Sequence, residues 1–123
     1  MSNEKDKLIF KLHAELCSTM ANPIRLEIIS LLRNEEKSVG DLAESAGISQ
    51  ANMSQHLTVL RRQAMVETRR AGATIYYRLA NPKMLKAFDI LREILFEQLE
   101  SEQELINDFK IATETKSLPH RRS

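Results

Sequence analysis

The sequence predicts a mainly α-helical fold with one small β-hairpin, and three observations indicate it. Only three glycines and three prolines occur in 123 residues, too few for the many turns of an all-β fold. Apolar residues recur with helical spacing through most of the chain, but the period changes to about two after Met65. Aromatic residues make up 5% and tryptophan is absent, so the core should consist mainly of aliphatic side chains and methionine.

Two helices are expected before residue 35. The first runs from about Asp6 to Met20, with an apolar stripe at Leu8, Ile9, Leu12, Leu16 and Met20. Asn22 can then cap a second helix, in which Pro23 takes the first position and Arg33 comes last. Apolar side chains cover most of the circumference of this second helix, so it should be the central core helix. A charged loop, residues 34–37, follows it.

Two short helices are then predicted to meet at Gly47. Ser38 suits the N-cap of the first, and Gly47 supplies the positive φ that ends it. Ser49 caps the second, whose buried face is expected to be Met53, Leu57, Leu60 and Ala64. The outward residues of this second helix are small, amide-bearing or arginine side chains, which suit base edges and phosphates. The pair is predicted to be a helix-turn-helix with a recognition helix.

The C-terminal half begins with the hairpin. Alternation from Val66 to Arg70 and the β-branched and aromatic run from Thr74 to Leu79 predict two strands around a tip at residues 71–73. This hairpin is a wing, which gives a winged helix-turn-helix with the order α-α-α-α-β-β-α. A last helix from about Lys83 to Ile111 would be about 40–45 Å long. We expect one domain, residues 1–112, and a disordered polar tail, residues 113–123.

The charge pattern separates the chain into regions. The overall charge is +1, but residues 49–80 carry five arginines and one glutamate, a net charge of +4, whereas residues 83–114 have a net charge of −4. A basic segment in a nearly neutral protein concentrates positive potential on one face, as nucleic-acid binding requires. One cysteine cannot form an internal disulfide, and neither a signal peptide nor a membrane span is visible. The expected location is therefore the reducing cytoplasm.

Four spaced motifs make this sequence similar to the ArsR/SmtB family of winged-helix repressors from bacteria and archaea. They are residues 20–29 (MANPIRLEII), 41–43 (DLA), 49–60 (SQANMSQHLTVL) and 72–79 (GATIYYRL). The resemblance covers roughly residues 8–100, with the motifs in family order. It implies a homodimer built on the first and last helices that binds double-stranded operator DNA and represses transcription.

The resemblance implies that the start of the recognition helix reads bases. The residues there are Gln50, Ala51, Ser54 and Gln55. Their chemistry fits, because glutamine can pair with adenine through two hydrogen bonds and an alanine methyl can contact the thymine methyl. The alternative is that the glutamines and serine are merely solvated helix residues.

Other candidates would contact the DNA backbone. His56 either contacts a phosphate or packs against the first helix of the motif. Arg61 and Arg62 are phosphate contacts or solvated surface residues, and the wing arginines Arg69 and Arg70 are stronger candidates for a phosphate or minor-groove contact. Thr74 and Tyr76 can join them, although Tyr76 or Tyr77 must also pack the wing onto the body.

No metal or other cofactor is expected. The family's Cys-x-Cys element is missing from residues 37–42, and in the last helix, which lacks histidine, Leu91 follows Asp89 where a histidine ligand would be needed. His13 and Cys17 lie four residues apart, so they could hold two metal ligands or let the imidazole activate the thiol. They could equally be a surface histidine and a half-buried cysteine near the dimer interface, and His120 lies in the tail.

Several functional alternatives stay open. A thiol-based redox response through Cys17 is one, and a crevice between protomers for an unknown small molecule is another. A winged helix can also bind protein, but such a version would tend to lose its arginines and gain exposed apolar residues. An enzyme is not expected, because Ser54 and His56 point to different helix faces and no glycine-rich loop accompanies them.

Overall fold

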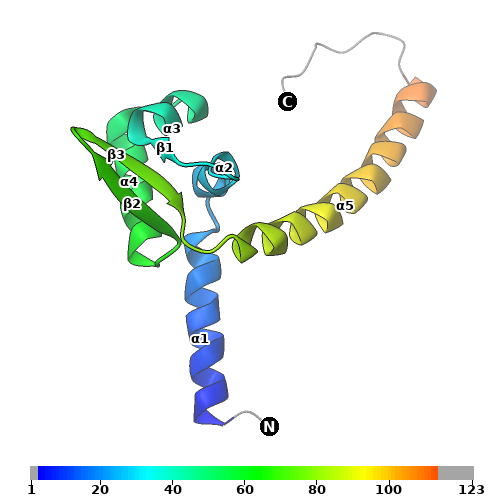
Figure 1. The fold of residues 1–123 in the computed structure, drawn as a ribbon. Coiled ribbons are helices and arrows are strands. Elements are labelled where there is room, and N and C mark those ends of the chain that lie inside the picture. The colour runs from blue at the N-terminus through cyan, green and yellow to red at the C-terminus, as the bar shows by residue number, and fades with distance from the viewer. Residues whose placement is uncertain (1–2, 114–123) are drawn as a thin grey trace. The chain divides into compact units, whose positions relative to one another are not determined.

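The computed structural model describes residues 3–113, with side chains to residue 108. In chain order these residues form α1 (Glu4–Thr19), α2 (Pro23–Leu31), β1 (Lys37–Ser38), α3 (Val39–Ala46), α4 (Gln50–Arg62), β2 (Val66–Ala71), β3 (Thr74–Leu79) and α5 (Lys83–Thr113) (Figure 1). The winged helix-turn-helix is thus confirmed. The chain divides after Leu85 into two units. The predicted disordered tail and His120 lie outside the described residues, apart from Thr113, which ends α5.

Side-chain caps begin the helices where the sequence places them. The Asn22 side chain accepts a hydrogen bond from the backbone of Arg25, and Pro23 follows as the first residue of α2. Ser38 caps α3 and Ser49 caps α4 in the same way. Helix α1 begins two residues earlier than predicted, because Asn3 and Asp6 form a capping box.

The end of α4 corrects one expectation. Ala64 was predicted on the buried face of the recognition helix, but the helix ends at Arg62 and Ala64 is exposed with a φ of +57°. The backbone N–H of Ala64 donates to the Arg61 carbonyl, and that of Met65 donates to the Leu60 carbonyl at 2.9 Å. This is a Schellman ending, in which the left-handed residue is usually glycine. Met65, at 1% exposure, therefore takes the core position predicted for Ala64.

The sheet has three antiparallel strands in the order β1-β3-β2, one more than the predicted hairpin. The additional strand is β1, in which Lys37 is opposite Tyr77 and Ser38 is opposite Tyr76. Sequence alternation cannot indicate a strand of two residues, so this segment was predicted to be a loop. The pairing joins the entrance of the helix-turn-helix to the wing.

The hairpin turn is tighter than predicted. Ala71 pairs with Thr74, so only Gly72 and Ala73 form the loop. Gly72 has a φ of +64°, which the first position of a two-residue hairpin turn requires and which glycine adopts without a steric penalty. Residues along β2 alternate between the two faces of the sheet, so Arg69 and Arg70 point to opposite sides, as predicted.

Helices α2, α3 and α4 enclose the core of the first unit and pack against one another, and α4 also packs against β2. As predicted, α2 is central, because Ile28, Ile29 and Leu32 are at most 2% exposed. The remaining buried apolar side chains are Met20, Leu42, Ala43, Met53, Leu57, Leu60, Met65, Val66 and Leu85. Replacing a fully buried leucine such as Leu57 with alanine would cost about 2–5 kcal/mol of stability.

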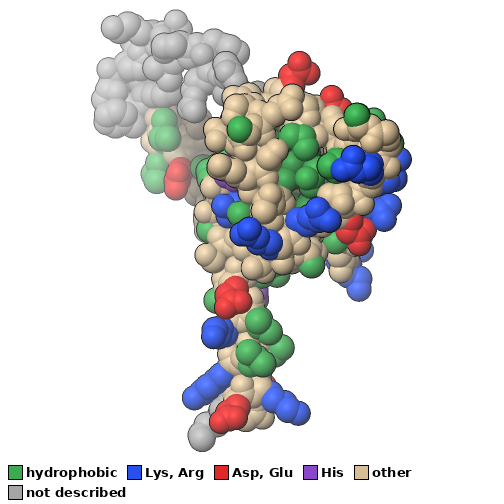
Figure 2. Space-filling model, turned by 90° about the vertical axis from the view of Figure 1, so that its left-hand side faces the viewer, with side chains coloured by type: hydrophobic (Ala, Val, Ile, Leu, Met, Phe, Trp, Pro, Cys, Tyr) green, Lys and Arg blue, Asp and Glu red, His purple; other side chains and the backbone are tan. Residues whose placement is uncertain are grey.

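Two helices expose apolar side chains in the single chain. On α1 these are Leu8, Ile9, Phe10, Leu12 and Leu16, and Figure 2 shows such side chains between the charged groups of this helix. On α5, which spans 31 residues, they are Ile90, Leu91, Ile94, Leu95, Phe96, Leu99, Leu105 and Ile106. A soluble monomer rarely exposes so much contiguous apolar surface, so both helices suit an interface. Within the described residues, no helix is long and apolar enough to cross a bilayer.

Candidate nucleic-acid interface

The first two turns of α4 present the predicted base-reading residues to solvent. Gln50, Ala51, Ser54 and Gln55 are all exposed, whereas Met53 and Leu57 on the opposite face are fully buried. The first turn of α4 carries no acidic residue that would repel a phosphate. The buried face therefore fixes which side of the helix can enter a DNA groove.

Gln50 lies against α3 as well as facing solvent. A Cβ atom added to Gly40 would be 3.5 Å from Nε2 of Gln50, so the glutamine amide lies over the first turn of α3.

The C-terminal part of α4 exposes Arg61 and Arg62 in its last turn. Among the residues that the structure describes, neither arginine forms an ion pair. Thr58, one turn earlier, bonds back to the Ser54 carbonyl through its hydroxyl at 2.9 Å. The two guanidinium groups are thus available to phosphates along the side of a groove.

His56 does not lie with the exposed residues of α4. The side chain is half-buried, and its Nδ1 accepts a hydrogen bond of 3.3 Å from Nε of Arg25 on α2. Burial, and next the Arg25 charge, lower the pKa of His56 below its ordinary value of 6.5. A neutral imidazole engaged by Arg25 carries no charge to attract a phosphate. The bond to α2 was not among the predicted environments of His56, and a phosphate contact or packing against α3 stays a prediction.

The two adjacent arginines of the wing, Arg69 and Arg70, have different surroundings. Arg69 donates hydrogen bonds to both carboxylate oxygens of Glu36, and its guanidinium lies 4.9 Å from the centre of the Tyr76 ring. Hydrogen bonding to Arg69 lowers the pKa of the Glu36 carboxyl. Arg70 lies on the other face of the strand, exposed and without an ion pair in the described part of the chain. Arg70 is therefore the stronger candidate for a phosphate contact in the free protein.

The hairpin contributes two further polar residues. Thr74 is exposed and opposite Ala71, next to the turn. Arg78, which sequence reasoning did not select, donates to Glu67 on the neighbouring strand at 3.1 Å. Tyr76 and Tyr77 are both half-buried, so each contributes to packing the wing. Only the tip of the hairpin thus combines exposure with an uncompensated positive charge.

Figure 2 looks at the molecule from the wing side and shows Lys and Arg side chains standing out over the body, with fewer acidic groups among them. The arginines of the basic segment, residues 49–80, are Arg61, Arg62, Arg69, Arg70 and Arg78. The charge distribution in three dimensions agrees with the +4 charge of residues 49–80. Such a surface attracts the DNA backbone before any base is read.

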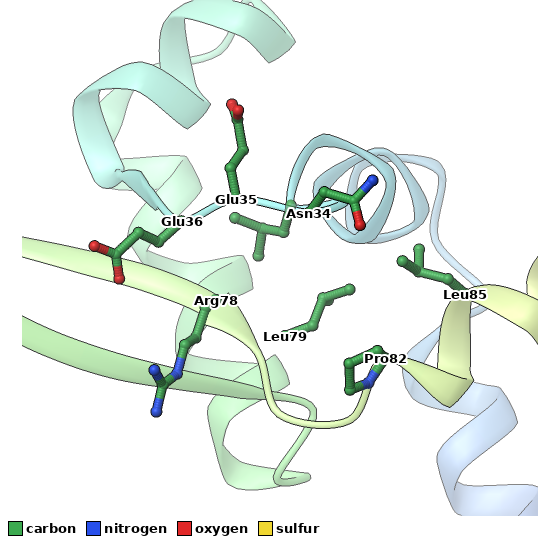
Figure 3. A pocket seen from close by; sticks show the side chains of 8 residues that line it. Asn34, Glu35, Glu36, Arg78, Leu79, Pro82 and Leu85 are labelled. Atoms are coloured by element: carbon green, nitrogen blue, oxygen red, sulfur yellow. The ribbon is translucent and has the colours of Figure 1, made fainter.

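A hollow of about 250 Å³ lies behind the wing. Its lining residues are Leu32, Asn34, Glu35, Glu36, Arg78, Leu79, Pro82 and Leu85. Figure 3 shows the charged ends of Glu35, Glu36 and Arg78 directed away from the centre, so the interior is apolar. Ligand pockets generally combine apolar walls with convergent polar groups, and this hollow lacks the second feature.

The possible sensing residues lie on α1. Cys17 is exposed with a free thiol, and His13 is exposed one turn before it. Among the described residues, no three histidine, cysteine, aspartate or glutamate side chains gather closely enough to hold a metal ion. Independence from metal therefore stays a prediction.

A capped, exposed recognition helix beside a basic wing defines a DNA-binding protein of the winged helix-turn-helix class. Residues 22–68 match the family described as bacterial regulatory protein, arsR family. The nodulation protein NolR of Rhizobium meliloti is 43% identical over 91 residues, which cover 74% of this chain and 75% of NolR. The chain belongs to the arsR family, whose members are DNA-binding transcription regulators.

Two further comparisons extend this assignment. The biofilm growth-associated repressor of Xylella fastidiosa (strain Temecula1) is 40% identical over 85 residues, covering 69% of this chain and 75% of the repressor. The solution structure of the homodimeric winged helix-turn-helix domain of Mb0332 from Mycobacterium bovis matches with a TM-score of 0.73 and 28% identity. That match covers 81% of this chain and 93% of the Mb0332 chain.

Proposed function

We propose that this protein is a homodimeric repressor that binds an inverted-repeat operator in the cytoplasm and needs no metal to do so. The recognition helix supports the proposal most directly, because Ser49 caps it and Gln50, Ala51, Ser54 and Gln55 form its exposed edge. Bound at a promoter, the dimer blocks transcription by occupying the operator.

The apolar surfaces of α1 and α5 support the dimer. Each would be covered by a second copy, as the homodimeric state of Mb0332 suggests. Two-fold symmetry then places two recognition helices on successive major-groove faces, so the half-sites should lie about 10–10.5 bp apart or a multiple of that.

The division between base-reading and backbone-contacting residues gives the test. Selection of bound sequences from a random DNA pool should return an inverted repeat. Gln50→Ala or Gln55→Ala should cost about 1–3 kcal/mol on that site and relax preference at particular bases. Arg70→Ala should weaken all sequences alike and reduce the salt slope by about one unit.

Three outcomes would contradict the proposal. A monomer at micromolar concentration in sedimentation would remove the basis for an inverted repeat. Failure to enrich any DNA sequence would favour a protein-binding winged helix. A reporter whose expression rises when the protein occupies its operator would show activation instead of repression.

A further inference from the structure

One side chain, that of Arg25, joins three helices of the first unit. It is half-buried in the first turn of α2, where its own N–H bonds the Asn22 cap. Its Nη1 donates to the carbonyl oxygen of Thr19, the last residue of α1, at 2.9 Å. Its Nε donates to Nδ1 of His56 on the recognition helix at 3.3 Å. One guanidinium thus connects the end of α1 with the inward face of α4.

The guanidinium is well suited to fix this geometry. It is planar and rigid, so hydrogen bonds from two of its nitrogens fix two directions at once, whereas a lysine ammonium donates from one freely rotating nitrogen. The end of α1 is itself held, because Thr19 and Met20 are 8% and 5% exposed. The rest of α1 exposes the apolar side chains that we propose to lie in the dimer interface.

We propose that Arg25 is a positioning residue that sets the orientation of the recognition helix relative to α1, and through α1 the separation of the two recognition helices in the dimer. We call the two hydrogen bonds of the Arg25 guanidinium, to the Thr19 carbonyl and to His56, the brace. His56 is its acceptor on the recognition helix. The inference rests on the proposed dimeric repressor and adds how that dimer would select half-site spacing.

Spacing is a sensitive measure of this orientation. Adding one base pair between half-sites rotates one half-site by about 34–36° around the DNA axis. A dimer with firmly held recognition helices can match only one spacing, whereas loosely held helices can follow both half-sites. Loss of the brace should therefore reduce discrimination between spacings while the base preference within a half-site remains.

The brace also depends on the protonation of His56. Nδ1 can accept a hydrogen bond only when the imidazole is neutral, and a protonated ring would repel the guanidinium of Arg25. Arg25 is the charged group that the described structure places against the ring, while the end of α1 presents the uncharged Thr19 carbonyl. Burial and the Arg25 charge lower the pKa of His56, so the brace is intact at neutral pH and weakens as the pH falls through that lowered pKa.

The test uses the full chain and three synthetic operators that carry the selected half-sites at the selected spacing, one base pair shorter and one longer. The parent protein should prefer the selected spacing by about tenfold or more, which is about 1.4 kcal/mol. Arg25→Ala should reduce that preference to about twofold, but keep the discrimination against a mutated half-site. Arg25→Lys keeps the charge but donates from a single nitrogen without the fixed fork geometry, so it should lie between them.

Two variants of His56 separate positioning from general stability. His56→Gln keeps a carbonyl acceptor that cannot be protonated, so its spacing preference should not change as the pH is lowered from neutral through the range in which the protein stays folded. The parent should lose its preference within that range as His56 becomes protonated. His56→Phe keeps a ring without an acceptor and should resemble Arg25→Ala at every pH. Circular dichroism establishes that each variant is folded.

Two results would contradict the proposed role of the brace. One is an unchanged spacing preference in both Arg25→Ala and His56→Phe. The other is the same dependence of spacing preference on pH in the parent and in His56→Gln. The second comparison decides the matter even if Arg25→Ala fails to fold. A parent protein that binds none of the operators at neutral pH would instead contradict the proposed function.

Discussion

At the scale of single residues, charges on the wing differ in what they can offer to DNA. Arg69 and Arg70 are adjacent in sequence, yet Glu36 and the Tyr76 ring occupy Arg69 while Arg70 is exposed. The alternation of β2 could be predicted from sequence, and with it the opposite directions of these arginines. The Glu36 contact could not, because it spans 33 positions and comes from a segment predicted to be an unpaired loop.

Removing the carboxylate should release Arg69. In Glu36→Gln we expect stronger binding to non-specific DNA and a salt slope steeper by up to about one unit, since another cation can contact a phosphate. Titrating a random duplex at several salt concentrations measures both quantities. Glu27→Gln is the matched control, because it removes the same charge from the exposed side of α2. Equal slopes in the two variants would show that Glu36 does not withhold Arg69 from DNA.

The exposure of the proposed base-reading residues was easier to predict than the contacts of the residues packed behind them. Helical periodicity separates the outward Gln50 and Gln55 from the buried face, and the structure agrees. The internal hydrogen bonds of Arg25 could not be predicted from the sequence, because an arginine on an apolar helix usually reaches solvent. His56 was predicted to contact a phosphate or α3, and only the packing of α2 against α4 reveals its partner.

At the scale of elements, the helix boundaries were predictable wherever a capping residue is specific. Ser38, Ser49 and Gly47 act as predicted, with Gly47 at a φ of +72°. Alanine at the end of α4 misled the prediction, because it fits the helical period and favours helix intrinsically. The tight turn into β2 requires the left-handed conformation at Ala64 whatever residue is present.

Ala64→Gly should therefore stabilise the protein. Glycine avoids the steric cost of a positive φ but gains entropy in the unfolded chain, so we expect a net increase of about 0.5–1 kcal/mol in the free energy of unfolding. Urea denaturation at a fixed protein concentration measures it. Ala73→Gly, in the hairpin loop at an ordinary negative φ, is the control and should be neutral or destabilising. A loss of stability in Ala64→Gly would mean that the strain is absent.

Helix α5 has an apolar stripe on one side and an acidic ridge on another. Helical spacing aligns Leu95, Leu99 and Ile106 in one stripe with Glu102, whereas Glu97, Glu100 and Glu104 form an acidic ridge elsewhere on the circumference. All of these residues are exposed in the single chain. If the stripe lies in the dimer interface, Glu102 is its one charged interruption.

Glu102→Leu should then strengthen the dimer by about tenfold, because a leucine would complete the apolar seam. Glu104→Leu makes the same chemical change on the ridge and should leave the dimer dissociation constant unchanged. Sedimentation equilibrium over a dilution series compares them. Equal effects from both substitutions would place the interface elsewhere on α5.

At the scale of the whole molecule, regulation is the property least accessible to the sequence. Surface composition indicates an interface, but a site shared between protomers depends on an assembly that one chain does not show. His13 and Cys17 illustrate the difficulty, since they are exposed on the same helix as the proposed interface. The spacing of cysteine, histidine and aspartate residues predicts that the family's metal arrangements are missing, but no residue pattern indicates an inducer.

We expect metal ions to leave this repressor unaffected. Zinc, cadmium or arsenite added to the reduced protein should change operator affinity by less than about tenfold, or about 1.4 kcal/mol, below most of the range of allosteric coupling. Fluorescence anisotropy with labelled operator measures it. A larger effect that persists in Cys17→Ser would reveal a site of carboxylate and histidine ligands.

Peroxide provides the complementary experiment on the thiol. Operator binding that is lost with peroxide in the parent and kept in Cys17→Ser would establish a redox switch at this exposed cysteine. Without such a switch, peroxide should affect both proteins equally.

The two residues of β1 have a mechanical consequence. Ser38 is opposite Tyr76 in the sheet and is also the N-cap of α3, so the wing and the helix-turn-helix share a residue at their junction. The wing and α3 cannot separate at this point without breaking the pairing of β1 with β3. The DNA-binding surface of the wing and the helix-turn-helix is therefore already assembled in the free protein. The rate of association with the operator should be limited by diffusion and charge, and not by the closing of a loop.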